Sequence, residues 1–329
     1  MFSRRAATAL CFVLAFAQPV LADDLSRFSL IEENDSLWFK SDQHYTQGGR
    51  FAELGPDLQP GSAWNLPFAL FDLFGRADQE NRRYSVEIGQ SIFTPTDRYL
   101  APPDPRDRPY AGYAYAGVHL LQEDNGHSLE DLEIQLGLVG PDAQGKLAQN
   151  SVHFLIHAQP FYGWKYQISN QAAGDISYDR YWRVKLLGDM VDWVPSAGLT
   201  GGNVLDYAQI GSLIRIGFNL GTDYGPARIR PALSGTDYVN ADNSTGALGG
   251  YFFFGAQGRA VARNIFLDGD DNSGPHIDKV PLVADLEAGA TFFVDRGLRL
   301  DLMAMRRSVE YVGQPHPDVL CTVGLAWAW

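Results

Sequence analysis

The sequence predicts an all-β protein, a closed antiparallel transmembrane β-barrel of twelve strands with a short helix in an external loop. Three observations favour this fold class. Short segments that alternate large apolar with small or polar residues recur through the chain, Gly and Pro separate these segments, and Tyr and Trp lie near their ends. Barrel strands have this alternation, with aromatic girdles at the two membrane interfaces. Beyond the N-terminus no apolar run approaches the ~20 residues of a membrane helix, which excludes a helical membrane protein.

The first 22 residues predict a secretory signal peptide. Arg4 and Arg5 precede a short apolar stretch at 6–17, and cleavage is expected after Ala22. We therefore divide the chain into a signal peptide (1–22) and a barrel (23–329). Removing two of the 26 basic residues leaves 24 against 39 acidic residues, a net charge of −15. With only Cys321 left, no internal disulfide can form, so a closed sheet is expected to supply the stability.

Twelve segments are predicted as strands, an even number as bacterial single-chain barrels require. They are 25–34, 45–54, 83–93, 110–122, 128–138, 175–187, 191–202, 207–219, 247–263, 278–294, 297–310 and 317–329. The last one alternates large and small residues from Cys321 to Trp329. It resembles the C-terminal strand of outer-membrane barrels, so we expect location in the cell outer membrane. A buried terminal strand of a soluble sandwich is the alternative interpretation.

Two connections are predicted to contain helices, at 64–74 and at 144–157. If the mature N-terminus starts in the periplasm, the connections near 35–44, 94–109 and 139–174 lie outside the cell. Two periplasmic connections, 55–82 and 220–246, are longer than the short turns that barrels usually have on that side. The acidic chain has no basic stripe, so nucleic acid is excluded as a partner.

The polar residues of the external connections are the candidates for chemistry. His153 is the candidate base, because a neutral imidazole titrates near working pH. At helical spacing, Gln149 and His157 share its face. No Gly-x-Ser-x-Gly elbow occurs, which favours activated water over an acyl-enzyme. A single loop His is more often a packing residue, and a lone Asn34-Asp35 pair is usually a turn.

Several motifs together resemble the lipid A 3′-O-deacylase family. They are Glu33-Asn34-Asp35, Tyr45-Thr46-Gln47-Gly48, Asp107 to Gly112, Val139-Gly140-Pro141, Gln149 to His153, and Arg259 to Gly269. The matches follow the family's order over nearly the whole mature chain. The resemblance implies a twelve-stranded outer-membrane barrel that removes the 3′-linked acyloxyacyl group from lipid A and uses Ca²⁺. Its site would lie between the barrel wall and an external helix.

By matching motifs, the resemblance implies that His153 activates water and that Asn34, Asp35 and Thr46 belong to the catalytic site. Asp35 is the expected Ca²⁺ ligand, since Ca²⁺ prefers hard oxygen donors, and a bound cation can polarise an ester carbonyl. The chain differs from some family members in two places: 94–109 contains no Lys, and Gln159 stands where they have a Glu. Asp268 to Asn272 is a second acidic segment, interpreted as a solvated loop rather than a metal site.

The expected partners are lipid A or lipopolysaccharide as substrate and outer-membrane lipid as surroundings, with the protein a monomer. Two other functions stay open on the sequence. An outer-membrane phospholipase would share calcium and interfacial ester chemistry, but Ser151 cannot share a helix face with His153. A non-enzymatic porin would conduct ions without hydrolysing lipid.

Overall fold

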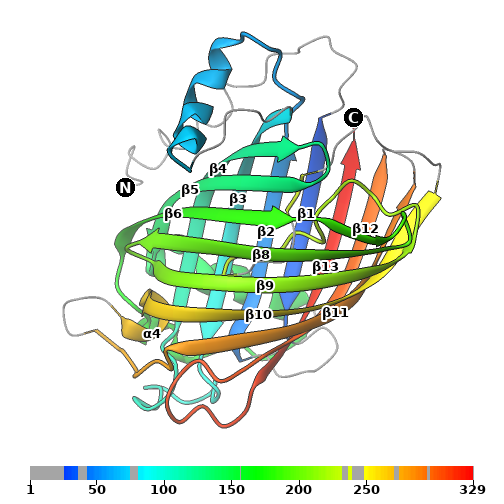
Figure 1. Cartoon of the computed structure of the whole chain (residues 1–329). Helices are drawn as coiled ribbons and strands as arrows, with labels where there is room; N and C mark the ends of the chain where they lie inside the picture. Colours follow the sequence, from blue (N-terminus) through cyan, green and yellow to red (C-terminus); the bar gives the residue numbers. More distant parts are fainter. Residues whose placement is uncertain are drawn as a thin grey trace.

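The computed structural model describes residues 26–35, 43–74, 81–155, 157–231, 236–238, 248–269, 274–294 and 297–328. The predicted signal peptide at 1–22 and the terminal Trp329 lie outside these residues. The described residues form a barrel with helical segments attached at its two ends (Figure 1).

One antiparallel sheet closes on itself to make the barrel. Its strands are β1 (Arg27–Asn34), β2 (His44–Leu54), β3 (Asn81–Thr94), β4 (Ala111–Asp124), β5 (Ser128–Val139), β6 (Gln171–Trp182), β7 (Val184–Leu187), β8 (Val191–Gly202), β9 (Leu205–Phe218), β10 (Leu248–Asn264), β11 (Leu282–Val294), β12 (Leu298–Arg307) and β13 (Asp318–Ala328). Sequence neighbours pair except β6 and β7, β1 pairs with β13, and β8 pairs with both β6 and β7. Because β6 and β7 are successive parts of one strand interrupted at Arg183, the barrel has the predicted twelve strands.

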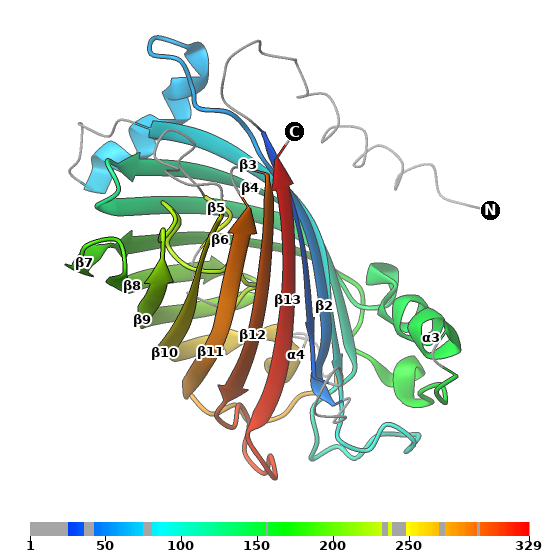
Figure 2. The same ribbon diagram turned by 90° about the vertical axis from the view of Figure 1, so that its right-hand side faces the viewer.

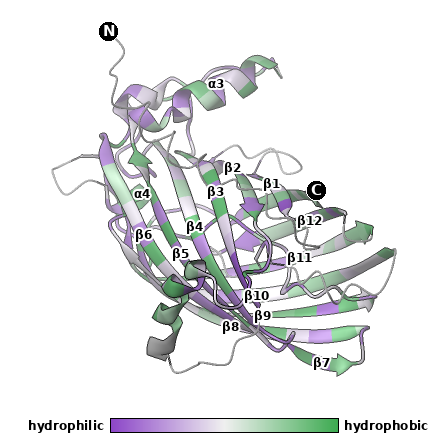
Figure 3. Cartoon of the chain, turned by 90° about the horizontal axis from the view of Figure 1, so that it is seen from above, coloured by the Kyte–Doolittle hydropathy of each residue, from purple (hydrophilic) through white to green (hydrophobic). Residues whose placement is uncertain are grey.

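Side chains alternate between the inside and the outside of the wall, as the strand period of two requires. On β9, for example, Gln209 and Arg215 are buried whereas Ile210, Ile214 and Ile216 are exposed. The exposed set on the other strands is likewise apolar, and the colours of Figure 3 alternate along the strands. The inside is therefore polar and the outside apolar, which is the arrangement of a barrel that lies in lipid.

Short helical segments lie beyond the strands. They are η2 (Ala63–Phe74), η3 (Pro141–Ala143), α3 (Gly145–Leu155), η4 (Gly163–Tyr166) and α4 (Ile265–Asp268). Among the described residues, no helix has the length and apolar character needed to cross a membrane. We call the barrel end at which the β5–β6 connection carries α3 the α3 rim. Both predicted helices are present, although 64–74 folds as a 3₁₀ helix with Pro67 inside it and α3 ends at Leu155, so His157 does not share its face.

The connection predicted at 55–82 ends at β3, which begins at Asn81, and its described part, 55–74, covers the outer wall at the end opposite the α3 rim. Phe68 and Phe71 of η2 are fully buried there against Leu120 and Tyr84. This connection is longer than the short turns expected at that end of a barrel. Its described part forms a second layer outside the wall.

The described part of the long connection 220–246 turns inward and lies in the lumen. In its described part, 220–231 and 236–238, Tyr224 and Tyr238 bond Glu123 near one end of the barrel. Arg228 reaches Glu33, which lies one residue before the last residue of β1 at the α3 rim. The connection thus runs along the lumen, and we call its described part the plug. Nearer the α3 rim, Phe266 of α4 stacks on Phe93 with ring centres 4.0 Å apart, so aromatic side chains also fill the barrel mouth.

Candidate active site

The sequence-predicted residues Asn34, Asp35 and Thr46 lie together where β1 turns into β2. The backbone N–H of Asp35 donates to the Thr46 carbonyl oxygen at 3.4 Å, and the Asp35 carboxylate accepts from the Gln43 backbone N–H at 2.5 Å. Asn34 pairs with Gln47 across the two strands. The carboxylate is almost fully buried in this turn. The structure therefore brings these three predicted site residues into one group.

A β-bulge aims Thr46 at the outer face of the barrel. The β2–β3 register shifts between Tyr45 and Gln47, and bulges of this kind re-aim side chains. The Thr46 hydroxyl lies 2.5 Å from the hydroxyl of Thr94. Thr94 and Ile88 are separated by an even number of positions on β3, so their side chains lie on the same face of the strand. Ile88 is 48% exposed on the outer wall. The hydroxyl pair thus faces outward, toward the lipid side.

Polar groups continue on this outer face next to the turn. Asn34 and Glu32 share the face of Leu30, which is 49% exposed to the outside. The Glu32 carboxylate hydrogen-bonds the side chains of Asn34 and Gln47. An otherwise apolar wall therefore carries a cluster of hard oxygen donors at the α3 rim.

Close backbone contact seats α3 on the outside of β3 and β4 (Figure 2). A Cβ added to Gly112 would lie 3.1 Å from the Gly145 backbone nitrogen, so glycine is needed for this approach. Gln90 donates to the Ala143 carbonyl at 2.6 Å. Trp164 is fully buried beneath the helix and its indole N–H donates to Gln149 at 2.8 Å. These contacts fix the inner face of α3 against the wall.

His153 lies on that inner face with a defined tautomer. Its Nδ1 is 2.7 Å from the carbonyl oxygen of Gln159. A carbonyl only accepts, so Nδ1 carries the proton and the lone pair of the neutral ring is on Nε2. The edge of the ring packs on Phe161, with centres 4.8 Å apart. The residue that differs from some family members, Gln159, thus orients the histidine through its backbone rather than its side chain.

The structure places all four predicted catalytic residues at the α3 rim; Asn34 and Thr46 face the outer side of the wall, and His153 lies in the layer outside it. Asn34, Asp35 and Thr46 belong to one turn, whereas His153 comes from the separate α3 layer that packs on β3 and β4. Sequence reasoning missed the supporting residues Trp164, Phe161 and Thr94. The only signal for Trp164 and Phe161 is the aromatic content of 161–166, which does not reveal that these rings lie beneath a helix, and Thr94 has no signal in the sequence.

The donor set of the turn suits Ca²⁺. A buried carboxylate, two hydroxyls and backbone carbonyls are hard oxygen ligands of the kind that Ca²⁺ takes. No nitrogen or sulfur donor is needed. The acidic segment that starts at Asp268 offers less, because Asp268 accepts from Lys279 at 2.8 Å and from the Asn264 backbone N–H; residues 270–273 lie outside the described residues.

A buried histidine connects the surrounding segments of the rim through hydrogen bonds. His44 has a positive φ of 62° at the start of β2 and is fully buried. Its Nδ1 lies 2.7 Å from Asp318, and Tyr311 and Thr96 lie 2.9 and 3.0 Å from its Nε2. Four segments of the rim meet at this one ring. Its partners come from β13 and from the β3–β4 and β12–β13 connections, so His44 positions the rim.

Nearby, Arg108 is fixed by Glu310 at 3.1 Å. Burial raises the pKa of Glu310, but Arg108 and Arg307 outweigh burial and hold this pKa below its ordinary value. The resulting charged pair joins the β3–β4 connection to the β12–β13 connection.

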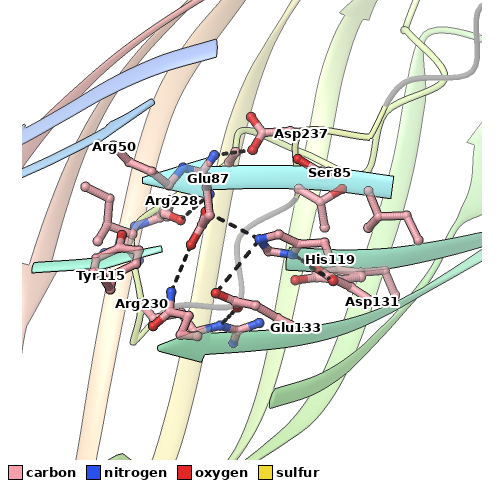
Figure 4. A pocket seen from close by; sticks show the side chains of 16 residues that line it. Arg50, Ser85, Glu87, Tyr115, His119, Asp131, Glu133, Arg228, Arg230 and Asp237 are labelled. Carbon is pink, nitrogen blue, oxygen red and sulfur yellow. Dashed lines mark hydrogen bonds and ion pairs between the residues drawn. The ribbon is translucent and has the colours of Figure 1, made fainter. Parts of the chain in front are cut away.

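A second polar cluster, which the sequence did not reveal, lies inside the barrel (Figure 4). Within the described residues, Glu87, His119 and Glu133 place ligand atoms within 4.8 Å of one another, as a metal site would require. They line a cavity of about 30 Å³. All three are inward positions of their strands, but only the β3–β4–β5 register, which pairs His119 with Glu133, brings them together.

The charges around this cavity argue against a cation there. Glu87 pairs with Arg50 at 3.3 Å, and Arg230 of the plug bonds both Glu133 and Asp179. Around the cavity four carboxylates face three arginines and His119; the carboxylates are those of Glu87, Asp131, Glu133 and Asp237, and the arginines are Arg50, Arg228 and Arg230. A divalent ion would have to displace arginines that already satisfy the carboxylates. We therefore assign this cluster to holding the plug.

Comparisons with known proteins agree with the fold. The family model described as outer membrane protein LpxR matches residues 6–329. The solved structure of LpxR from Salmonella typhimurium aligns with a TM-score of 0.71 at 18% identity, covering 92% of this chain and 100% of that one. The β-domain of the Bordetella autotransporter BrkA aligns at 0.46 with 8% identity, covering 93% and 100%. Among curated protein sequences, none matches.

The alignment with the Salmonella structure confirms the closed twelve-stranded barrel, and the family match confirms location in the outer membrane. The family model spans nearly the whole chain, as the sequence motifs do. The chain belongs to the outer membrane protein LpxR family, which confirms the resemblance indicated by its motifs.

Proposed function

We propose that the protein is a lipid A deacylase that removes the 3′-linked acyloxyacyl group by Ca²⁺-assisted attack of a water molecule activated by His153. The observation that carries the proposal is the position of an oriented histidine on the outer wall of an outer-membrane barrel, at the same rim as a turn rich in oxygen donors. Water-activated ester hydrolysis needs a base and a group that stabilises the oxyanion. The rim supplies candidates for both.

The base follows from the tautomer of His153. Because Nδ1–H donates to the Gln159 carbonyl, Nε2 is the atom that accepts a proton from the attacking water. The carbonyl also stabilises the imidazolium that forms, since its oxygen remains a partner for Nδ1–H. Packing of the ring edge on Phe161 limits its rotation. The proton then passes from Nε2 to the leaving sugar oxygen.

Asp35, the hydroxyl of Thr46 and carbonyls of the turn would hold Ca²⁺, with Asn34 beside them. When bound, the ion polarises the ester carbonyl as a Lewis acid. The buried Asp35 carboxylate is oriented by the Gln43 N–H, and Thr46 by Thr94. These contacts prearrange the oxygens, so little reorganisation is needed when the ion and the ester arrive.

The outer position of the site fits a lipid substrate. An ester of lipid A lies near the boundary between headgroups and acyl chains, and the rim cluster faces this boundary rather than the lumen. The substrate can therefore approach laterally, without leaving the membrane. We expect the protein to act as a monomer, with the barrel closed by the pairing of its own first and last strands.

The two other functions fit less well. A serine-dependent phospholipase would need a serine beside His153, but Ser151 is exposed and its hydroxyl bonds the Leu147 carbonyl. A porin would need an open lumen, whereas the plug and the aromatic side chains at the α3 rim fill it.

Mass spectrometry of lipid A after incubation with the purified protein tests the proposal. In Ca²⁺ we expect a species that has lost one acyloxyacyl group, and with chelator we expect unchanged lipid A. Loss of an acyl chain from added phospholipid, with lipid A intact, would favour the phospholipase. Equal turnover in excess chelator would remove Ca²⁺ from the mechanism.

A further inference from the structure

The helix α3 turns its apolar side chains away from the protein. Leu147, Phe154 and Leu155 are 63%, 81% and 74% exposed, and their spacing of seven and eight residues places them on one helix face. Gln149 and His153 are buried on the opposite face. A helix that packs on a protein from water has the reverse arrangement, with its apolar stripe toward the core. The medium around the outer face of α3 is therefore apolar.

The wall beside α3 is apolar as well. On β5, Leu136 and Leu138 are 66% and 45% exposed, and Val139 ends the strand at the α3 rim. Figure 3 shows α3 outside the ring of strands, seen from above. The exposed face of the helix thus continues the lipid-facing band of the barrel beyond the ends of the strands.

Basic and aromatic side chains are exposed on α3 and in the segment 162–166 that follows it in the same connection. Lys146 precedes Leu147 and is exposed. Lys165 lies over the ring of Tyr166 at 4.7 Å, and Tyr162 is 55% exposed. Helices that lie in a membrane interface combine a lipid-buried apolar face with basic and aromatic residues at headgroup level. In a chain with a net charge of −13, cations at this edge also favour contact with phosphorylated lipid headgroups.

We propose that the outer face of α3, formed by Leu147, Phe154 and Leu155, is inserted among the acyl chains of the surrounding leaflet as an interfacial anchor. The occupant is lipid, since the face is continuous with a wall that is itself covered by lipid. Because His153 lies on the reverse side of the same helix, insertion also sets the depth of the site. The insertion does not depend on the proposed hydrolysis.

Depth-dependent quenching tests the insertion. A Leu155→Cys protein carrying an environment-sensitive nitrobenzoxadiazole label is reconstituted in phosphatidylethanolamine–phosphatidylglycerol vesicles, with or without doxyl-labelled acyl chains. Arg106→Cys, at an exposed position of the β3–β4 connection, is the matched control. The unsubstituted protein, whose Cys321 is buried, measures background labelling.

The expected result is blue-shifted emission and strong doxyl quenching at position 155, with water-like emission and little quenching at position 106. Equal, water-like behaviour of both labels would overturn the proposal. So would a blue shift at position 155 that doxyl lipid does not quench and that vanishes on dilution of the protein in excess lipid, because the face would then be covered by a second copy.

A kinetic experiment adds an independent check where the enzyme is active. Replacing Leu147, Phe154 and Leu155 together by Ser should raise KM for lipid A in vesicles by about tenfold or more, with kcat within about twofold. In detergent micelles the two proteins should have similar KM values. An unchanged KM in vesicles would contradict anchoring, whereas absence of hydrolysis by the parent would contradict only the proposed function.

Discussion

Two histidines sit on opposite sides of the same barrel wall, and their surroundings differ. His119 points into the lumen, where Asp131 and Glu87 bind its two ring nitrogens at 2.9 and 3.3 Å. His153 lies outside the wall on α3, where one backbone carbonyl binds Nδ1. His119 has acidic neighbours, whereas the ring of His153 packs on Phe161. The inner ring is held by anions at both nitrogens, whereas the Nδ1 of the outer ring contacts a neutral backbone carbonyl.

This difference in ring partners distinguishes a cluster that stabilises the fold from a candidate catalytic site. A carboxylate at each nitrogen favours the charged imidazolium, which has no lone pair with which to accept a proton. A neutral carbonyl at one nitrogen fixes the tautomer without requiring charge. The lumen cluster is also the one with mutually compensating charges, as expected for groups that hold a plug. Side chains that are arranged like metal ligands are therefore weak evidence for a functional site. Whether each charge is already compensated by a neighbouring group is the stronger criterion.

Replacing the outer histidine should have the largest effect on activity. We expect His153→Ala to lower the rate of deacylation by about 10²–10⁴-fold, the usual contribution of a positioned base, as measured by single-turnover kinetics. The folded barrel should persist, judged by heat-modifiable migration on gels. His157→Ala is the control, because His157 is exposed beyond the end of α3. Parent-level turnover by His153→Ala would remove this residue from the chemistry.

The next largest effect is expected at the turn. Asp35→Ala should lower Ca²⁺-dependent turnover by about 10²–10³-fold, because a lost oxygen ligand weakens both ion binding and oxyanion stabilisation. Chelator should reproduce the defect in the parent and add little to the variant. Asp104→Ala, which removes an exposed carboxylate paired with Arg106, should keep its activity. Similar losses of turnover in both variants would indicate that the loss of any carboxylate at this rim lowers the rate, and would contradict a specific Ca²⁺ site at Asp35.

In the lumen the expected effect is on stability. Arg230→Met leaves the buried carboxylates of Glu133 and Asp179 without this cation and should cost about 3–5 kcal/mol of stability, as breaking a buried ion pair does. The measurement is the temperature at which the compact gel form is lost. Arg230→Lys should restore part of it. Deacylation at low temperature should stay near the parent level, and a selective loss of deacylation in the stable protein would connect the lumen to catalysis.

The smallest expected effect comes from the helix seat. Gly112→Ala adds a Cβ 3.1 Å from the Gly145 nitrogen and should shift α3 by a few tenths of an ångström, lowering deacylation by up to about tenfold. Gly258→Ala on β10 is the matched control, because its Cβ would meet no atom within 4 Å. Equal activities of the two variants would show that the rate tolerates displacement of α3.

The alternation of side chains was sufficient to predict the barrel, because a strand period of two is a local property of the sequence. The alternation predicted twelve strands. One of them, 175–187, was predicted as continuous, and in the structure it is interrupted at Arg183. The positions of the long connections relative to the barrel wall were not predictable from the alternation. The plug enters the lumen because Arg228 and Arg230 find carboxylates from β1, β5 and β6, and these pairings depend on barrel closure.

The site was predictable to the extent that motifs mark it. Asn34, Asp35, Thr46 and His153 were named from the resemblance, and the structure places all four at one rim. Their support was not predictable, because the partner of His153 is a backbone carbonyl, which carries no residue identity. The role of His44 also needed the structure. Its sequence neighbours do not show that Asp318, 274 residues away, would bind its ring.

A matched pair of substitutions tests most directly whether chemistry occurs on the outer wall. His153→Gln and His119→Gln make the same change on the two sides of the barrel, and the rate of lipid A deacylation in Ca²⁺ is measured for the folded form of each by mass spectrometry. We predict that His153→Gln loses at least about 10²-fold, whereas His119→Gln retains the parent rate within about threefold and unfolds at lower temperature. A severe loss of rate in His119→Gln with full activity in His153→Gln would contradict the account and move the site into the lumen.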